Sequence, residues 1–205
     1  MNKWLITCLA VTLTIALPAH SDIDTRSPDV IVKESTSALL DALDNRREEF
    51  TENPALLREM VNHDMLPLID TEYSARLILG RSGRGIEPEQ REAFATAMSD
   101  QLLSRYADGL LDFKAESRPD VLPLKGNNSE KMTRVRTRFT LEDGGFVPVD
   151  FAFRKTEQGW KAFDVTIEGI SYVMTYRNQI APLVAKEGIE KVTADIRAGN
   201  IALEE

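Results

Sequence analysis

Few side chains in this sequence are of the types that perform acid–base, nucleophilic or metal chemistry. The 205-residue chain has one cysteine, Cys8, and two histidines, His20 and His63. His63 is a candidate general base, but a surface or structural histidine is the commoner interpretation of a lone imidazole. The chain has no nucleophile elbow, H-E-x-x-H, P-loop or dinucleotide-binding glycine motif, and no Lys-Ser/Thr follows its glycine-bearing loop RSGRG at 81–85. We therefore expect no catalytic residue, no metal site and no cofactor.

Arginines gather on one face of a predicted strand at 133–141. Arg134, Arg136 and Arg138 alternate along it, and we expect Asp150 and Asp164 of the following strands to point the same way. A solvated, salt-bridged face is the simpler interpretation, and a docking surface for a partner protein is the alternative. With these charges outside, no acid or base is left to point inward, as a pocket enzyme would require.

The opposite face of these strands is apolar. Stretches 133–141, 147–155 and 160–169 alternate hydrophobic and polar residues with period two, which is typical of half-buried antiparallel strands. Ten hydrophobic residues share the face: Val135, Phe139, Leu141, Val147, Val149, Phe151, Phe153, Phe163, Val165 and Ile167. They form either an ordinary core under helices or one wall of a ligand cavity, and the pattern alone leaves both open.

Loop lengths predict how the strands pair. A three-residue loop at 143–145 pairs Phe139 with Val149 across the first hairpin. A three-residue loop at 157–159 likewise pairs Phe151 with Val165 and Phe153 with Phe163. A two-residue first loop would put the apolar residues on opposite faces, so the longer loop is favoured.

Helical patterns surround these strands. Apolar residues at helical spacing predict a helix over 29–50, and Pro54 and Pro88 are typical first residues of two more. Asp70 is expected to cap a helix that ends at Gly80, and Gly188 to separate two C-terminal helices. We predict an α+β fold, with a helical part at about 28–112, a sheet at about 113–169 and C-terminal helices at about 171–198.

The first 21 residues have the pattern of a secretory signal peptide. A lysine precedes an apolar run from Trp4 to Leu17, and small residues before position 22 favour cleavage after Ser21, with cleavage after Ala19 as the alternative. This leader contains the only cysteine, so no disulfide is expected in the single mature domain at 22–205. The chain carries 25 Lys and Arg against 33 Asp and Glu, a net charge of −8, which argues against nucleic-acid binding.

Several stretches resemble one known family. LPLIDTEYSARLILG at 66–80, EPEQREAFATAM at 87–98, VPVDFAFRK at 147–155, GWKAFDVTIEGISYVMTYRNQI at 159–180 and KEGIEKVTADI at 186–196 are similar, in order, to the MlaC family. These are phospholipid-binding proteins of the Gram-negative periplasm, also known as toluene-tolerance proteins. The chain departs from the family pattern at RSGRG, where many relatives have a bulky aromatic residue.

The resemblance implies a fold, a ligand and partners. It implies an NTF2-like curved sheet wrapped by helices, with a deep apolar cavity for the acyl chains of a phospholipid. It implies a monomer that shuttles lipid between an outer-membrane lipoprotein–porin complex and an inner-membrane ABC transporter with a hexameric MCE-domain subunit, and so maintains outer-membrane lipid asymmetry. A ligand-free envelope adaptor and a pocket enzyme on the same fold remain alternatives.

Twelve residues are expected to bind the lipid. Tyr172, Tyr176 and Arg177 should lie at the cavity rim or anchor their helix, and for Arg177 an anchoring role is preferred to contact with phosphate. The expected lipid-binding residues are Met98, Leu102, Val135, Phe139, Val149, Phe151, Phe153, Phe163, Val165, Ile167, Val173 and Met174.

Overall fold

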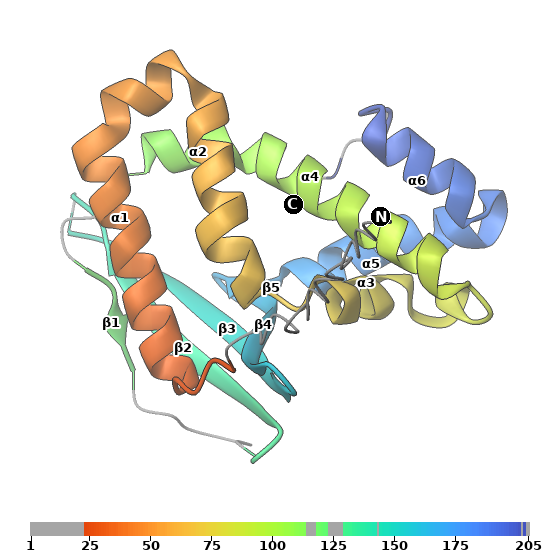
Figure 1. Ribbon diagram of the computed structural model, residues 1–205, viewed down its shortest axis with the longest axis horizontal. Coiled ribbons are helices and arrows are strands. Elements are labelled where there is room, and N and C mark those ends of the chain that lie inside the picture. Colours follow the sequence, from red (N-terminus) through yellow and green to blue (C-terminus); the bar gives the residue numbers. More distant parts are fainter. Residues whose placement is uncertain (1–22, 114–117, 123–128, 143, 202, 204–205) are drawn as a thin grey trace, which may run out of the picture.

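Among the described residues, helices lie before and after an antiparallel sheet (Figure 1). The computed structural model describes residues 23–113, 118–122, 129–142, 144–201 and 203, so the leader predicted at 1–21, with its cleavage site, lies outside the described residues. The predicted α+β fold is confirmed. The helices are α1 (Pro28–Glu52), α2 (Pro54–Met60), the π-helix η1 (Val61–Met65), the 3-10 helix η2 (Leu66–Leu68), α3 (Thr71–Leu79), the 3-10 helix η3 (Gly80–Gly83), α4 (Pro88–Asp112), α5 (Tyr172–Glu187) and α6 (Ile189–Arg197).

Local sequence signals place several helix ends where we predicted them. Pro54 opens α2. The Asp70 carboxylate accepts a hydrogen bond from Tyr73 N at 2.9 Å, which satisfies one of the free N–H groups in the first turn of α3. Gly80 ends α3 with φ +53°, and Gly188 separates α5 from α6 with φ +84°, a backbone conformation that favours glycine.

The sheet has five antiparallel strands in sequence order. The three long strands were predicted, and the two-residue strands at its edges were not. The strands are β1 (Asp120–Val121), β2 (Met132–Thr140), β3 (Phe146–Thr156), β4 (Gly159–Ile167) and β5 (Ile170–Ser171).

The predicted pairing of β2 with β3 is wrong by two residues. Phe139 lies opposite Val147 instead of Val149. The chain reverses one residue earlier than expected, with Leu141 N donating to the Gly145 carbonyl at 2.9 Å. Because the error is an even number of residues, every β2 and β3 side chain still lies on its predicted face.

The second hairpin contains a bulge that the pattern did not predict. Phe151 pairs with Val165 as expected, but Phe153 pairs with Ala162, so the expected pair of Phe153 with Phe163 is wrong. Phe163 is the extra residue of β4. A bulge of this kind bends a strand and re-aims its side chains, and this one lies beside an apolar cavity.

Helices α1 and α2 cover the apolar face of the sheet. Near its beginning, α1 packs Ile31 against Val135 and Phe153. Further along, Leu43 belongs to a cluster with Phe139. A third cluster joins α3, α4, α5 and α6, which gather at the other end of the molecule (Figure 1). The sheet face predicted as a cavity wall is therefore largely filled by α1.

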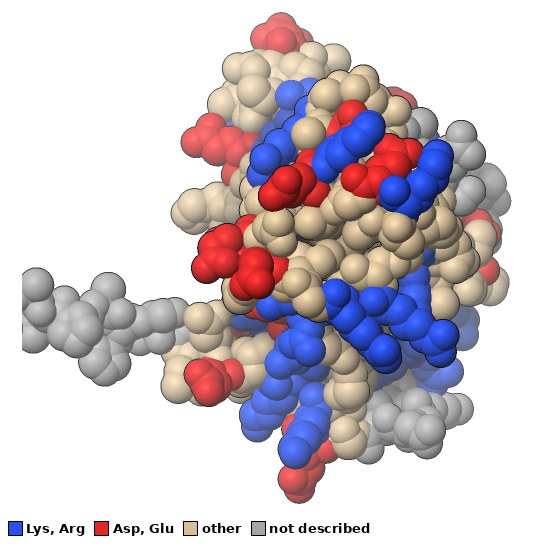
Figure 2. Space-filling model, turned by 90° about the vertical axis from the view of Figure 1, so that its right-hand side faces the viewer, with Lys and Arg blue, Asp and Glu red and all other residues tan. Residues whose placement is uncertain are grey.

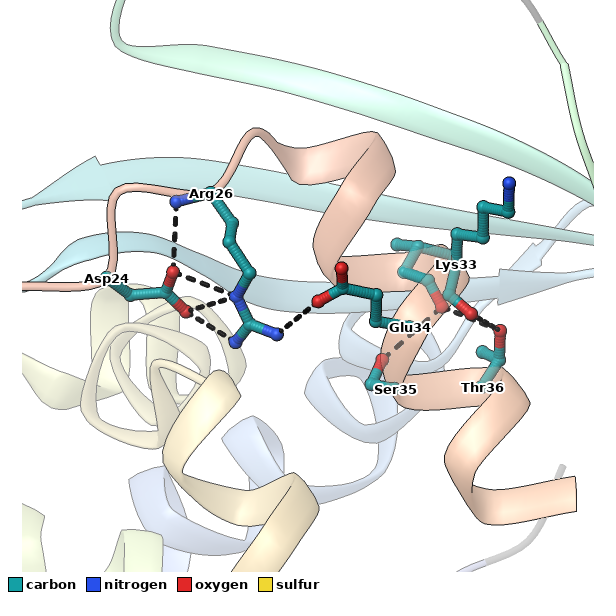
Figure 3. A network of polar contacts seen from close by, with 7 residues as sticks. Asp24, Arg26, Lys33, Glu34, Ser35 and Thr36 are labelled. Atoms are coloured by element: carbon teal, nitrogen blue, oxygen red, sulfur yellow. Dashed lines mark hydrogen bonds and ion pairs between the residues drawn. The ribbon is translucent and has the colours of Figure 1, made fainter. Parts of the chain in front are cut away.

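An ion-pair network ties the segment before α1 to the sheet and to α1 itself (Figure 3). Arg26 Nη2 lies 2.7 Å from Asp24 Oδ2, and Arg26 Nη1 lies 2.9 Å from Glu34 Oε2. The Asp24 backbone N–H donates to the Gln158 carbonyl at 3.1 Å in the β3–β4 turn. The hydrogen bond from Arg26 lowers the pKa of the Asp24 carboxyl below its usual range.

Among the residues that the structure describes, no helix is both long enough and apolar enough to cross a bilayer.

Candidate functional site

An apolar cavity of about 280 Å³ lies beside β4, between α3, α4, α5 and the η1–η2 segment. Its wall is almost entirely carbon. Residues on α4 contribute at positions 95, 98, 99, 102 and 103, and residues on α3 at positions 71, 74, 75 and 78. This 3–4 spacing places the lining residues of each helix on one face. The cavity exists partly because Ala75 and Ala95, on facing helices, have side chains too small to fill the space between them.

The bulge in β4 fixes α3 against the sheet. Its carbonyl groups point away from β3 and accept hydrogen bonds from the helical side. Ser74 Oγ donates to the Phe163 carbonyl at 2.7 Å, and Asp70 N donates to the Ala162 carbonyl at 2.7 Å. The Tyr73 ring meets the Phe163 ring edge-on at 5.1 Å between centroids. The first turn of α3 thus closes one side of the cavity.

Asp164 lies on the sheet face of the arginines, as expected, because it pairs with Ala152, which in turn pairs with Arg134. It also lines the cavity, which the sequence did not predict. Both carboxylate oxygens are occupied. Oδ2 accepts a hydrogen bond from Ser171 Oγ at 2.6 Å, and Oδ1 accepts one from Val173 N at 3.0 Å. Asp164 therefore caps α5 and positions its first turn, and its oxygens are not free to act on a ligand as a general base.

The two tyrosines of α5 face the cavity. Tyr172 and Tyr176 both line it, with ring centroids 5.8 Å apart in an edge-on arrangement, and Tyr176 is only 1% exposed. Arg177 instead lies against Gly80. A Cβ added to Gly80 would come within 2.9 Å of the Arg177 Nε atom. This placement agrees with the anchoring role, because Arg177 joins α5 to the end of α3.

Five of the twelve predicted lipid-binding residues line the cavity: Met98, Leu102, Phe163, Val165 and Val173. The other seven lie elsewhere. Val135, Phe151 and Phe153 pack in the core under α1, Phe139 and Val149 belong to the cluster at the far end of α1, Ile167 is half-buried at the end of β4, and Met174 is 49% exposed.

Several lining residues were missed by reasoning from the sequence. Most belong to α3, to the start of α4 and to the η1–η2 segment, and include Val61, Leu66, Ala75, Ile78 and Ala95. The i, i+3, i+4, i+7 row at 95, 98, 99 and 102 is visible in the sequence, and would have pointed to α4 as a wall.

His63, the one histidine among the described residues, lies outside the cavity. His63 is 86% exposed on η1, and its Nδ1 atom is 2.7 Å from Asp64 Oδ1. The Asp64 carboxylate raises the pKa of His63. The residues that the structure describes include no group of three or more His, Cys, Asp or Glu side chains arranged to hold a metal ion.

Comparison with known proteins gives the family. The model of the MlaC protein family matches residues 33–198. The chain belongs to the MlaC family. A curated relative from Haemophilus influenzae, the intermembrane phospholipid transport system binding protein MlaC, is 25% identical over 195 residues, which cover 93% of this chain and 89% of the relative. The toluene tolerance protein ttg2D of Pseudomonas putida is 25% identical over 180 residues, 86% of this chain and 82% of that protein.

A solved structure has the same fold. The phospholipid-binding protein of Ralstonia solanacearum, determined in complex with a phospholipid, superposes with a TM-score of 0.72 at 21% sequence identity. The match covers 83% of this chain and 99% of that one. This member of the MlaC family therefore has the fold of a protein that binds a phospholipid.

Proposed function

We propose that this protein is a periplasmic phospholipid carrier that holds acyl chains in the cavity beside β4. The observation that carries the proposal is the apolar wall, in which the one carboxylate among the described lining residues, Asp164, is engaged at the end of α5. A wall of this kind favours hydrocarbon and offers no free charged group to a polar substrate. The phospholipid named for the Ralstonia solanacearum protein supports the same ligand class.

The size of the cavity sets the scale of the binding energy. Filling about 280 Å³ with hydrocarbon contributes roughly 7 kcal/mol at about 24 cal/mol per Å³. That is equivalent to about eight methylene groups at about 0.8 kcal/mol each. A bilayer offers a similar gain for the same groups, so transfer between membrane and carrier is nearly neutral. Because free lipid in water is far less stable, the lipid passes by direct contact.

Two complete acyl chains require more room than this. About 30 methylenes gain roughly 24 kcal/mol on leaving water, about three times what the described cavity accommodates. The wall formed by η1 and η2 is the part best suited to move, because neither segment contains a buried residue. A π-helix is rare and is found mostly at functional sites. We infer that 61–69 moves outward when lipid enters.

The carrier function implies partners and a compartment. We infer that a signal peptide at 1–21 exports the chain to the periplasm, where it acts as a monomeric domain. It exchanges phospholipid with an outer-membrane lipoprotein–porin complex and with an inner-membrane ABC transporter bearing a hexameric MCE-domain subunit, and thereby maintains outer-membrane lipid asymmetry. Because the transfer itself is nearly neutral, these partners must set its direction. No catalysis is part of this function.

The test is to purify the protein from the periplasm, extract it with organic solvent and quantify phospholipid by mass spectrometry. The carrier predicts about one phospholipid per protein. If the extract contains no phospholipid, and the purified protein also takes up none from vesicles, a ligand-free adaptor would be favoured. Turnover of a small molecule by the purified protein would favour an enzyme.

A further inference from the structure

A second hollow, of about 420 Å³, lies at the corner where α3, η3 and the beginning of α4 meet. It is more polar than the cavity beside β4. Three arginines, one tyrosine, two leucines and two glycines line it: Tyr73, Arg76, Leu77, Leu79, Gly80, Gly83, Arg84 and Arg91.

The hollow and the apolar cavity lie on opposite sides of α3. Ser74, Ala75 and Ile78 face the cavity, whereas Tyr73 and Arg76 face the hollow. With 3.6 residues per turn, these two sets project about 180° apart around the helix. A molecule in the hollow is therefore separated from the cavity by α3, and cannot be the head group of the same lipid.

The charges in the hollow are unbalanced. Arg76 and Arg84 form no ion pair with any residue that the structure describes. Arg91 has one long contact, 3.5 Å from its Nε to Glu72 Oε1, and this buried Nε has no hydrogen-bond partner. No carboxylate lines the hollow. The chain as a whole is acidic, with 33 acidic against 25 basic residues. At this hollow, however, three guanidiniums lie together, and Glu72 is the only described carboxylate that pairs with any of them. An anion bound among them would offset their mutual repulsion.

The two glycines that line the hollow stand where a side chain would clash with its neighbours. A Cβ at Gly83 would lie 2.9 Å from Leu79 Cβ. Gly80 has φ +53°, and a Cβ there would lie 2.9 Å from Arg177 Nε. The Arg177 guanidinium therefore stands directly behind Gly80 and adds a further positive charge to the same corner.

The surface charge agrees with this arrangement. The α3–α4 connection lies at the right-hand end of the molecule in Figure 1, below the α5–α6 region, so both face the viewer in Figure 2. Lysine and arginine gather in the lower half of that face, while acidic side chains lie mostly above them and at the edge. An anion approaching this corner meets a positive local field although the whole chain is acidic.

We propose that this hollow binds a phosphate-type oxyanion between the guanidinium groups of Arg76, Arg84 and Arg91. The planar guanidinium donates two parallel hydrogen bonds to an oxyanion, which makes arginine the preferred side chain for phosphate. The Nε–H of Arg91 supplies an unused donor at the base, and Arg76 and Arg84 complete the site from the rim. This site is independent of the acyl-chain cavity and extends the proposed function.

The test measures binding of inorganic phosphate to the full mature protein by isothermal titration calorimetry in low-salt buffer without other multivalent anions. The double variant R76Q/R84Q should bind phosphate at least about tenfold more weakly, because it loses two charge-assisted contacts. The matched control is Arg81→Gln, which removes an exposed arginine of the same segment that does not line the hollow. It should change affinity less than about twofold.

A second arm identifies the source of the oxyanion. Phosphate binding is measured again with vesicles of phosphatidylglycerol and phosphatidylcholine present. If the vesicles weaken phosphate binding to wild type but not to R76Q/R84Q, the natural ligand is a phosphate displayed on a membrane. Phosphate binding that such vesicles leave unchanged would indicate a soluble anion. No heat of binding up to about 10 mM phosphate, or equal affinities of wild type and R76Q/R84Q, would overturn the proposal. Phospholipid content, measured on the same samples, should be the same in all variants.

Discussion

Replacing Ala95 with phenylalanine should block the acyl-chain cavity. Ala95 lies on α4, is 5% exposed and lines the cavity, so the added ring projects into the empty space. The ring replaces about six methylene-sized groups, of the roughly eight that the cavity accommodates. The loss is about 5 kcal/mol of hydrocarbon burial, equivalent to more than a thousandfold in affinity.

The assay compares Ala95→Phe with Thr96→Phe. Thr96 is the next residue on α4 and is exposed, so the same ring there points away from the cavity. Phospholipid extracted from Ala95→Phe should fall below about a tenth of the wild-type amount, while Thr96→Phe should retain it. Both variants should remain folded by circular dichroism, since overpacking typically costs about 1–3 kcal/mol. Wild-type lipid content in folded Ala95→Phe would refute the assignment of this cavity to the acyl chains.

Three further predictions concern how the site is built and how stable it is. Asp164→Ala should lower the free energy of unfolding in urea by about 1–2 kcal/mol, because Val173 N in the first turn of α5 loses its acceptor and Ser171 Oγ loses its partner. An unchanged midpoint would contradict that role. Hydrogen–deuterium exchange at 61–69 should be slower in lipid-loaded than in lipid-free protein, and equal exchange would contradict the inferred movement. Arg26 lowers the pKa of Asp24 in the folded protein. The ion pair therefore stabilises the folded state fully at pH values above the ordinary carboxyl pKa. This stabilisation is lost as the pH falls through the lower pKa of the folded state. The melting temperature of wild type should therefore be higher than that of Asp24→Asn at pH 6, and the two should become equal in acid. A difference in melting temperature that does not change with pH would argue against this linkage.

The strands could be predicted from the sequence because side-chain alternation determines which residues share a face. The pairing could not be predicted equally well, because it depends on the residue at which the loop reverses. Leu141 closes the first hairpin with Gly145, one residue earlier than the glycine-rich loop suggested. The error of two residues preserved the faces, which explains why Val135 and Phe139 were correctly predicted to share one apolar surface.

The place of the cavity could not be predicted from the same pattern. An apolar sheet face looks identical in sequence whether it is covered by side chains or by a ligand. Here Ile31 and Val32 of α1 fill the space over Val135 and Phe153. The cavity instead lies where the bulge at Phe163 bends β4, and a bulge depends on long-range packing that local alternation does not encode.

The helix ends were predicted more closely, because their causes are local. The Asp70 cap, the stop at Gly80 and the break at Gly188 each depend on one side chain or on a positive φ. The part of the site carried by α4 was also partly predictable, since Met98 and Leu102 lie one turn apart on one face of the helix.

A crystal structure of the protein purified with its co-bound lipid would show directly where the acyl chains lie. We expect continuous acyl-chain density beside β4, in contact with Met98, Leu102 and Val165, and a segment 61–69 displaced outward to make room. Acyl density on another part of the molecule, with this cavity empty or closed, would contradict this expectation.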